Sequence, residues 1–509
     1  MDKEIVVDIN PYQTRTVLLE EGAPSEIYIE QRGKERLVGN IYKGRVQNVL
    51  PGMQAAFVDV GLERNAFLYA GDIKLDDGEF QFGDSFTEVP TEIPNIKDIV
   101  KPGQEIMVQV IKEPVGNKGV RVTTHITLPG RTLVLMPMVN YIGVSRRIED
   151  EKERTRLKET IAKVKPDNMG VIVRTAALDK SVEEFESDMA FLTRMWERIQ
   201  KKCQMLTAPR LIHAEEPLVF RTIRDLFTPD IARLTINDRE FYEKVQVVAG
   251  ILSPNLKDRV VLQDTLPDRF DELNLDAVID KALSRKVWMK NGAYIIIDQT
   301  EALTTIDVNT GKYVGNTDNL QETITATNCE AAKEIARQLR LRDISGIIII
   351  DFIDMDEIAD KERVLETLRS ELRKDRTKSN VLGITQLGLI EMTRKKSRKC
   401  ISNTLETTCP YCGGTGRVMT AETVLLKVRK KLMRSFATED HQGYLLKVHP
   451  EIARMIYENT TESAPILPKQ AGRSIWIQQD PSLHIHDFSI VHIASGEELK
   501  RVRSLAKLY

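Results

Sequence analysis

The chain has 509 residues, of which 41% are hydrophobic and 29% are charged. This composition is typical of globular protein, and the length exceeds one ordinary core. A net charge of −2, from 73 Lys and Arg against 75 Asp and Glu, excludes a global attraction to nucleic acid, so any RNA site must be a local basic patch. No apolar run approaches the ~20 residues of a membrane span. The start of the chain is no signal peptide, and five mostly isolated cysteines favour a reducing compartment. We expect a multidomain cytoplasmic protein.

Residues 37–128 contain short β-rich runs separated by glycine and proline, a pattern typical of a small barrel. Phe57 and Phe67 lie in two of these runs. Either ring alone is more often a core residue than a stacking platform. The turn between the runs places both near one edge, however, where aromatic rings can stack on bases. Lys118, in a predicted turn at 116–119, is either a phosphate contact or a solvated hairpin lysine.

The pattern changes to mixed α/β from Pro129 to Ala214, with a strand predicted at 170–175 and a helix at 182–203. Arg174 and Thr175 place hydrogen-bond donors at the end of this strand. Arginine binds a terminal phosphate through two parallel hydrogen bonds, and a threonine hydroxyl adds a neutral donor. An arginine at a strand end is more often solvated, so spacing alone leaves both interpretations open.

Two acidic strand ends are the most informative feature of the sequence. Asp307 and Asn309 end one apolar run, and Asp351 and Asp354 follow the next. The intervening segment, 322–342, has helical spacing, which predicts a βαβ unit with parallel neighbouring strands. Oxygen ligands without nearby His or Cys favour Mg²⁺ over zinc, and Mg²⁺ can activate a water against a phosphodiester. The alternative is that Asp307 caps a turn and Asp351 ends a strand.

Asp298, after another apolar run, is a weaker third candidate near these strands. Beyond them lies a basic stretch, 369–378 and 393–399, which is either a solvated face or a contact to an RNA backbone.

A zinc-knuckle-like turn follows at Cys409-Pro410-Tyr411-Cys412. Two thiolates are half of a tetrahedral site, so the missing ligands would come from a second chain and make zinc a dimer link. A redox pair and an unmetallated turn are the alternatives. After Gly416, helical patterns and two strands near 474–478 and 488–493 predict a small mixed domain.

Together these ordered motifs resemble the catalytic region of the ribonuclease E/G family, from the N-terminus to about Gly416. The motifs that carry the resemblance are the barrel block, Ser145-Arg146-Arg147-Ile148, Val173-Arg174-Thr175, the run from Glu301 to Asn309, Arg340-Leu341-Arg342-Asp343, Ile350-Asp351-Phe352-Ile353-Asp354-Met355 and Cys409-Pro410-Tyr411-Cys412.

The resemblance implies a multidomain α/β fold. Its parts are an RNase H-like domain (1–36 and 215–280), an inserted S1 domain that is an OB-type β-barrel (37–128), a 5′-sensor domain (129–214), a DNase I-like catalytic subdomain (281–400), a zinc link (401–416) and a small C-terminal α/β domain (417–509). It also implies a Mg²⁺-dependent, single-strand-specific endoribonuclease. Such an enzyme cuts AU-rich RNA, prefers a 5′ monophosphate, and acts in rRNA maturation and mRNA decay.

The resemblance assigns roles by position. Asp307 and Asp351 match the Mg²⁺ ligands and Asn309 the residue that supports them, with Asp354 a further candidate. Arg174 and Thr175 match the 5′-phosphate sensor, in a pocket lined by Gly130 and Val134. Phe57, Phe67 and Lys118 match the RNA contacts of the S1 domain. Cys409 and Cys412 match a Zn²⁺ site shared between the chains of a dimer, which pairs into a tetramer.

Two other functions compete with this one. The first is a non-catalytic S1-type RNA-binding protein, against which the intact Asp307, Asn309 and Asp351 count. The second is a DNA-directed phosphodiesterase, which the S1 segment and the sensor-like residues oppose. We also expect no long disordered C-terminal arm, and so no scaffold that recruits other decay enzymes.

Overall fold

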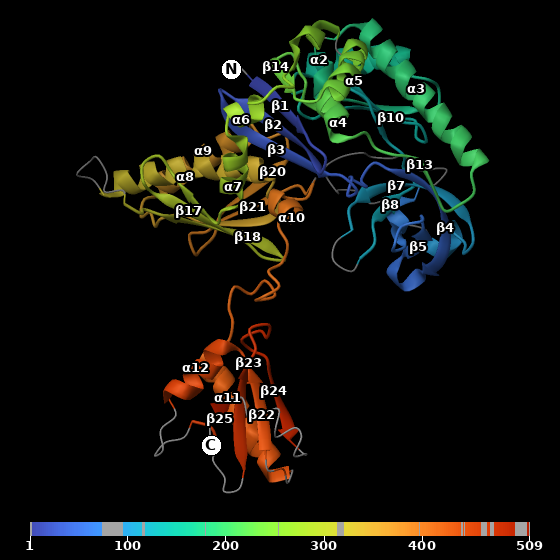
Figure 1. Ribbon diagram of the computed structural model, residues 1–509. Helices are drawn as coiled ribbons and strands as arrows, with labels where there is room; N and C mark the ends of the chain where they lie inside the picture. Colours follow the sequence, from blue (N-terminus) through green and yellow to red (C-terminus); the bar gives the residue numbers. More distant parts are fainter. Residues whose placement is uncertain are drawn as a thin grey trace. The chain divides into compact units, whose positions relative to one another are not determined.

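A computed structural model of the chain describes residues 3–73, 95–114, 118–178, 180–252, 254–312, 320–396, 398–438, 441, 443–459, 466–468, 473–493 and 506–507 (Figure 1). Its internal contacts divide it into two units, 1–404 and 405–509, which are described separately. The predicted domain boundaries inside these units stay predictions. In the described part of the chain, no helix is long and apolar enough to cross a bilayer.

A five-stranded sheet joins the N-terminal residues to a segment much later in the chain. Its order is β15(Val260–Leu262), β14(Ile231–Ile236), β1(Lys3–Ile9), β2(Gln13–Glu20) and β3(Ala23–Gln31). β1 pairs with β14 in parallel and with β2 antiparallel. Helices α4(Leu218–Asp225) and α5(Arg239–Leu252) share its core with Ile5, Leu18 and Leu234. The turn η4(Pro254–Arg259), α6(Arg269–Glu272) and α7(Leu275–Leu283) follow.

A six-stranded sheet curls into the predicted barrel. Its order is β13(Arg210–His213), β4(Ile41–Leu50), β5(Ala55–Asp59), β6(Ala66–Tyr69), β8(Arg121–Thr123) and β7(Glu105–Lys112), with β4 also pairing β7. The short helices η1(Pro51–Met53), η2(Ala70–Asp72) and α1(Ile96–Ile99) lie between strands. A Cβ at Gly44 would lie 2.5 Å from Val58 Cγ1, so the barrel wall requires glycine there.

A four-stranded sheet follows, with two helices of its own. Its order is β11(Ile142–Val144), β12(Gly170–Val173), β10(Leu133–Met136) and β9(Leu128–Pro129), and the helices are α2(Glu151–Val164) and α3(Val182–Met205). Leu133, Val171, Phe185 and Trp196 are buried together in their core. The predicted helix at 182–203 is confirmed. The predicted strand is shorter than expected, because Thr175 already begins the turn η3(Thr175–Ala177).

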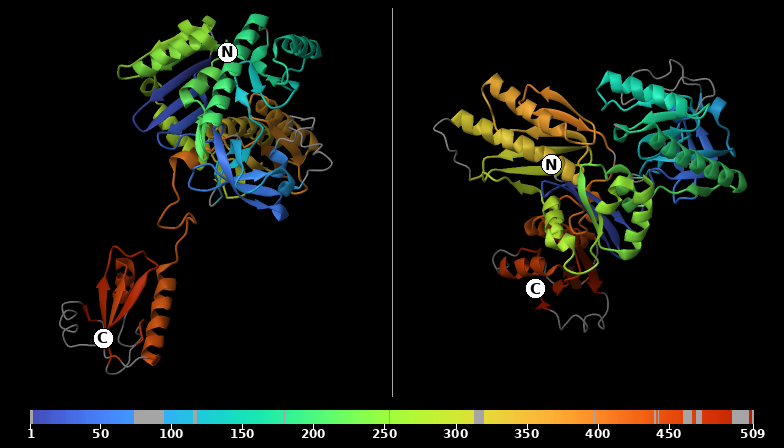
Figure 2. Two further views of the ribbon diagram at one scale, coloured as in Figure 1. Left: turned by 90° about the vertical axis from the view of Figure 1, so that its right-hand side faces the viewer. Right: turned by 90° about the horizontal axis from the view of Figure 1, so that it is seen from above.

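The acidic strand ends lie on a second six-stranded sheet. Its order is β16(Lys286–Trp288), β17(Tyr294–Gln299), β18(Leu303–Asn309), β19(Gly346–Asp351), β21(Ile390–Arg394) and β20(Ser379–Ile384). β18 and β19 are parallel neighbours joined by α8(Leu320–Arg342), which confirms the predicted βαβ unit. Figures 1 and 2 show α8 and α9(Ile358–Leu372) side by side on one face of this sheet. The short α10(Ile401–Leu405) follows.

The second unit is a small mixed α/β domain. Its sheet has the order β24(Phe488–Ile493), β22(Gly443–Val448), β23(Ser474–Gln479) and β25(Ala506–Lys507). α11(Ala421–Thr438) and α12(Pro450–Asn459) share its core with Tyr444 and Ile475. The helical pattern after Gly416 and the two late strands are therefore confirmed.

Candidate active site and RNA-binding surfaces

Strand alternation separates the acidic residues from the core. Ile306 and Val308 of β18 are buried in the cluster that includes α8, so Asp307 between them points to the opposite, exposed face. On β19, Ile348 and Ile350 are buried in the same cluster and Asp351 is exposed. Asp307 and Asp351 are direct partners in the register of these parallel strands. Neighbouring strands lie about 4.8 Å apart, so the two carboxylates share one small area of the open face.

The electrostatics of this area favour a bound cation. Asn309 Nδ2 donates to Asp307 Oδ2 at 2.9 Å and so fixes that carboxylate. Partial burial, and then the negative charges of Asp307 and Asp354, raise the pKa of Asp351 above its usual range. A cation held between the carboxylates would relieve this repulsion.

The donor set suits Mg²⁺ better than a metal that needs a full protein cage. Mg²⁺ is held by one or two carboxylates and keeps several water ligands, which matches Asp307, Asp351 and the supporting Asn309. Among the described residues, no three His, Cys, Asp or Glu side chains converge on one point. Asp298 does not extend the cluster either, because its carboxylate is paired with Arg285.

The predicted sensor residues lie around the end of β12. Arg174 donates to the carbonyl of Gly130, and its Nη2 lies 2.7 Å from Asp225 Oδ1. Val134 pairs with Ile172 across β10 and β12, and Thr175 directly follows the arginine. The Arg174 side chain is still 28% exposed, so an anion can reach it. The structure thus brings Gly130, Val134, Arg174 and Thr175 to one place.

A buried carboxylate, Asp188, and a half-buried one, Asp225, shape this place. Asp188 Oδ2 accepts from Thr132 N and Leu133 N, at 2.8 and 3.0 Å, and a Cβ at Gly130 would lie 2.6 Å from Asp188 Oδ1. Gly130 therefore lets helix α3 hold the strand connection at 130–133. Burial opposes ionisation of Asp225, yet the hydrogen bonds and charges of Arg224 and Arg174 hold its pKa below the usual range. An ionised Asp225 orients Arg174.

The barrel places its two predicted aromatic residues together. Phe57 and Phe67 are direct partners across β5 and β6, with ring centroids 6.1 Å apart in an edge-to-face arrangement. Both are half-buried, so each presents part of its ring to solvent. Lys118 is exposed, and the strand that it precedes pairs with Phe67 through Arg121. Residues 116 and 117 of its predicted turn lie outside the described residues.

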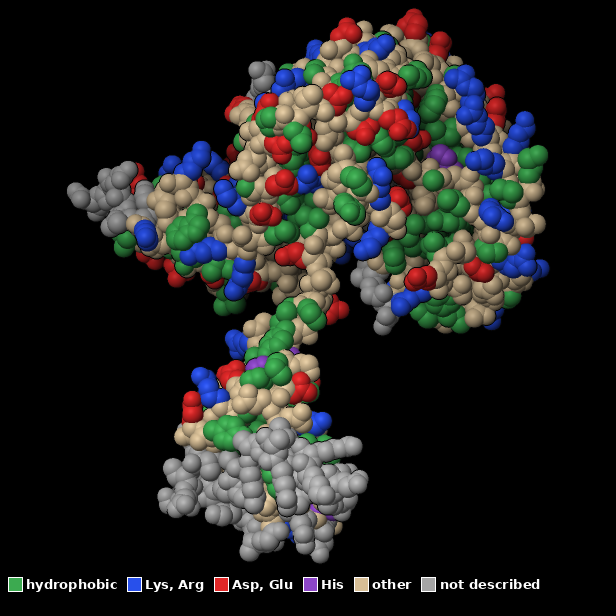
Figure 3. Space-filling model, viewed as in Figure 1, with side chains coloured by type: hydrophobic (Ala, Val, Ile, Leu, Met, Phe, Trp, Pro, Cys, Tyr) green, Lys and Arg blue, Asp and Glu red, His purple; other side chains and the backbone are tan. Residues whose placement is uncertain are grey.

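A basic groove on α3 was not predicted from the sequence. A hollow of about 700 Å³ is lined by α3 and β13. Its basic side chains are Arg194, Arg198, Lys201 and Lys202. Figure 3 shows Lys and Arg side chains gathered along this helix. The sequence does contain a signal for this groove: basic residues recur at helical spacing within 194–202. They lie on the exposed face of a helix whose apolar face is buried.

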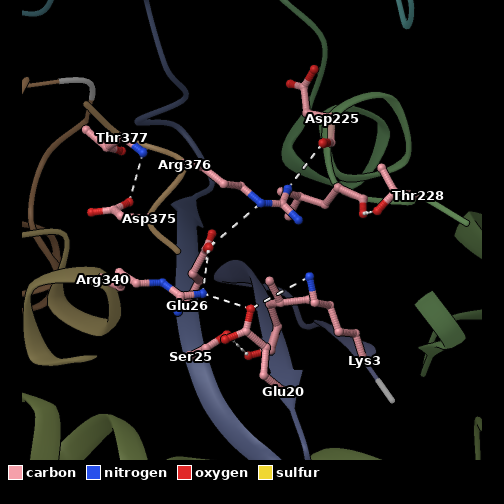
Figure 4. Close-up of polar contacts among 12 residues, drawn as sticks. Lys3, Glu20, Ser25, Glu26, Asp225, Thr228, Arg340, Asp375, Arg376 and Thr377 are labelled. Carbon is pink, nitrogen blue, oxygen red and sulfur yellow. Dashed lines mark hydrogen bonds and ion pairs between the residues drawn. The ribbon is translucent and has the colours of Figure 1, made fainter. Parts of the chain in front are cut away.

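The basic stretch after α9 is largely engaged within the protein. Arg376 Nε lies 3.9 Å from Glu26 Oε1, and Arg340 of α8 pairs with the same buried carboxylate at 3.4 Å (Figure 4). Arg373 and Lys374 pair with Glu366 and Glu371. These contacts give Arg373, Lys374 and Arg376 partners within the protein, and the choice between a solvated face and a contact to RNA stays open for residues 369–378.

In the second unit, Cys409 and Cys412 are free thiols on one turn. Hydrogen bonds from the backbone of Gly416 and Gly414 lower the pKa of Cys412, and Gly416 N lies 3.3 Å from its Sγ. His484 Nε2 lies 2.6 Å from the carbonyl oxygen of Tyr411, between the two cysteines. The thiolate is the form of cysteine that binds zinc.

Comparison with known proteins decides the relationship of this chain. The profile of the "Ribonuclease E/G family" matches residues 127–397, and that of the "S1 RNA binding domain" matches residues 37–125. Ribonuclease G of Escherichia coli (strain K12) is 40% identical over 491 residues, which is 96% of this chain and 100% of that protein. The chain belongs to the ribonuclease E/G family. As a member of this family it is an enzyme, a ribonuclease with an S1 domain.

Other family members align over nearly the whole chain. Ribonuclease G of Haemophilus influenzae is 40% identical over 489 residues, covering 96% of this chain and 99% of that protein. Ribonuclease E of the same organism is 36% identical over 500 residues, covering 98% of this chain but 53% of that longer protein. The ribonuclease E/G match contains β18, β19 and Arg174, and the S1 match contains Phe57, Phe67 and Lys118. The roles of these residues stay predictions.

Proposed function

We propose that this ribonuclease is a Mg²⁺-dependent, single-strand-specific endoribonuclease that cuts AU-rich RNA in rRNA maturation and mRNA decay. The observation that carries the proposal is the pairing of Asp307 with Asp351 on the open face of a sheet whose other face is buried. A rigid strand pair holds the two carboxylates in place before substrate arrives, so little reorganisation is needed during catalysis.

Asp307 and Asp351 would hold the metal, while the hydrogen bond from Asn309 fixes the orientation of Asp307. A bound Mg²⁺ supplies an activated water and neutralises charge that develops on the scissile phosphate. The exposed face around the carboxylates leaves room for an extended strand. Asp354 contributes charge near Asp351 without completing a three-carboxylate site among the described residues.

RNA affinity would come from surfaces outside the carboxylate area. The Phe57 and Phe67 rings offer stacking edges, and Lys118 offers a phosphate contact. The basic groove on α3 adds a local positive patch to a chain whose net charge is −2. Separate binding surfaces raise the effective concentration of the scissile segment at a site with little sequence preference of its own.

Arg174 and Thr175 would recognise a 5′ monophosphate, with Gly130 and Val134 lining the pocket. Support comes from the contacts of Arg174 with the Gly130 carbonyl and Asp225, which orient a partly exposed guanidinium. A guanidinium fixed in this way can form paired hydrogen bonds with a phosphate.

Cys409 and Cys412 would bind Zn²⁺ together with the same two residues of a second chain, in a dimer or a dimer of dimers. Two adjacent thiolates supply half of a tetrahedral site, and no larger His, Cys, Asp or Glu group occurs among the described residues. A second copy of the turn would complete the coordination.

The test is cleavage of one AU-rich single-stranded RNA that carries a 5′ monophosphate, triphosphate or hydroxyl, with Mg²⁺ or with EDTA. The proposal predicts internal cuts that require Mg²⁺ and are fastest on the monophosphate. Single-stranded DNA of the same sequence serves as a matched substrate and should stay intact. Tight binding without cutting would instead favour a non-catalytic RNA-binding protein.

A further inference from the structure

An aromatic cluster lies on the same sheet face as the candidate active site. Trp288 of β16 and Tyr294 of β17 are direct strand partners, with ring centroids 5.1 Å apart in an edge-to-face arrangement. Lys286 Nζ lies 4.0 Å from the centroid of the tryptophan ring and 3.6 Å from that of the tyrosine ring. Trp288 is 55% exposed. Contiguous exposed aromatic surface, rather than a single exposed ring, marks binding sites in soluble proteins.

The register of the sheet aligns this cluster with the carboxylates. One row across four neighbouring strands contains Lys286, Ile296, Asp307 and Asp351. The next row contains Trp288, Tyr294 and Asn309. Residues directly opposite one another in a sheet point to the same face. Trp288 is two strands from Asn309, about 10 Å at the usual strand spacing.

The core-facing side of β16 is occupied by Val287. Val287, between Lys286 and Trp288, packs against the buried cluster under α8 and α9, so its two neighbours must point to the open face. Gly311 lets the adjoining loop approach the tyrosine ring closely, because a Cβ there would lie 3.1 Å from Tyr294 Cδ1 and 2.5 Å from the Gly292 carbonyl oxygen. The ring pair is thus held in place while its outer surface stays open.

A structural role would be to stabilise the edge strand β16 by a cross-strand pair. That role needs contact between the two rings. It does not need an exposed tryptophan, or a lysine that lies in the same row as the two carboxylates. Lys286 takes part in no ion pair within the described residues, so its charge is available to a phosphate. An aromatic ring beside a cation is the combination that binds single-stranded nucleic acid without strong sequence preference.

We propose that Trp288 and Tyr294, with Lys286, form a subsite that stacks one base of the single-stranded RNA next to the scissile phosphate. The proposal rests on the proposed function for the position of the cut, and it assigns β16 and β17 to substrate binding. The subsite holds the strand on the open face so that the adjoining phosphate lies over Asp307 and Asp351. Because every base has a flat face, the subsite accepts A and U alike.

Fluorescence tests the subsite without requiring cleavage. The chain has three tryptophans, and Trp196 and Trp476 are only 4% and 6% exposed, so Trp288 is the one that RNA can quench by stacking. A short AU-rich RNA added to the Asp351→Asn protein in EDTA should quench the emission to saturation. The same titration with Trp288→Phe added should show no quenching. Equal quenching in the two proteins, or none in either, would overturn the proposal.

Cleavage rates locate the stacked base. With abasic nucleotides placed one at a time around the cut, kcat/KM of the wild type should fall about tenfold at one position, the effect of losing one stacked base. Trp288→Ala should lower kcat/KM about tenfold on intact RNA and show no further fall at that position. Trp288→Phe should restore most of the activity. Tyr12→Ala, which truncates an 82% exposed aromatic on the turn after β1, is the matched control and should match the wild type.

The outcomes separate this proposal from the proposed function. If the wild type cleaves RNA but Trp288→Ala matches it at every position, the subsite is wrong and the ribonuclease function stands. If the wild type quenches without cleaving, the base-stacking surface stands and the proposed reaction falls. A lower oligomeric mass for Trp288→Ala would show that a second copy of the chain covers this face, and would overturn the proposal.

Discussion

Two groups of charged side chains in this ribonuclease are built in opposite ways. Asp307 and Asp351 lie exposed on the open sheet face. Partial burial raises the pKa of Asp351, and the negative charge of its neighbours raises it further. Glu26 of β3 is buried and lies beside Arg340 of α8 and Arg376 (Figure 4). Burial opposes its ionisation, yet these arginines and Tyr28 hold the pKa of Glu26 below its usual range.

The difference indicates which charged groups bind a ligand and which stabilise the folded chain. The exposed pair needs a cation from outside to relieve the repulsion between its carboxylates. Removing one of these carboxylates should therefore affect chemistry and leave folding intact. The buried group already has its counter-charges, and it ties the five-stranded sheet to α8, so its removal should affect folding. The predictions that follow separate these two behaviours, beginning with the largest expected effect.

Asp351→Asn should lower the cleavage rate by at least about a thousandfold while RNA affinity stays nearly unchanged, because the metal serves chemistry more than binding. Cleavage rates and fluorescence-based RNA binding measure the two quantities. Glu391→Gln, which alters an exposed carboxylate on neighbouring β21 of the same sheet, is the control and should retain activity. Wild-type rates in Asp351→Asn would remove Asp351 from the active site.

Glu26→Gln should lower the free energy of unfolding by about 3 kcal/mol, roughly a hundredfold in the equilibrium, because Arg376 loses its buried counter-charge and Arg340 keeps only the partly exposed Glu20. A carboxyl whose native pKa is depressed stabilises the fold above its unfolded pKa, and that contribution disappears as pH falls through the native pKa. The difference between the two proteins should therefore shrink below about pH 4.

Urea unfolding at several pH values measures this difference. Glu366→Gln is the matched control, since its partner Arg373 is exposed and the pair is worth about 0.5 kcal/mol or less. Equal losses in Glu26→Gln and Glu366→Gln would show that the buried group does not tie the five-stranded sheet to α8.

Arg174→Gln should abolish an approximately tenfold preference for 5′-monophosphorylated over 5′-hydroxyl RNA, because glutamine cannot form the paired charged hydrogen bonds of a guanidinium. The ratio of kcat/KM for the two substrates is the measurement. Arg156→Gln removes an exposed arginine of α2 that pairs with Glu153 and should leave the ratio unchanged. A preserved ratio in Arg174→Gln would remove the sensor assignment.

Cys409→Ser combined with Cys412→Ser should release zinc and halve the molecular mass of the assembly, since each chain would supply half of the ligands. Metal analysis and light scattering report the two effects. Cys400→Ser alters the other cysteine near this turn in the sequence and should retain zinc and mass. An unchanged mass without zinc would show that other contacts hold the chains together.

Much of the candidate active site could be predicted from the sequence because its signal is local. The alternation of Ile306, Asp307 and Val308 fixes which side chain leaves the core, and the helical spacing of 322–342 makes the two strands parallel. The Trp288 cluster could not be predicted, because it depends on the register of β16 against β17. The pairing of Asp298 with Arg285 could not be predicted either, since it depends on how the residue before β16 lies against β17.

The central claim is that Asp307 and Asp351 together bind one catalytic divalent cation. Electron paramagnetic resonance of Mn²⁺, which can replace Mg²⁺ at oxygen sites, counts bound ions without relying on cleavage. We predict one bound Mn²⁺ per chain in the wild type at a concentration that also supports cleavage, and none in Asp307→Asn, whose fold and zinc content are unchanged. The same number of bound Mn²⁺ ions in both proteins would contradict the account.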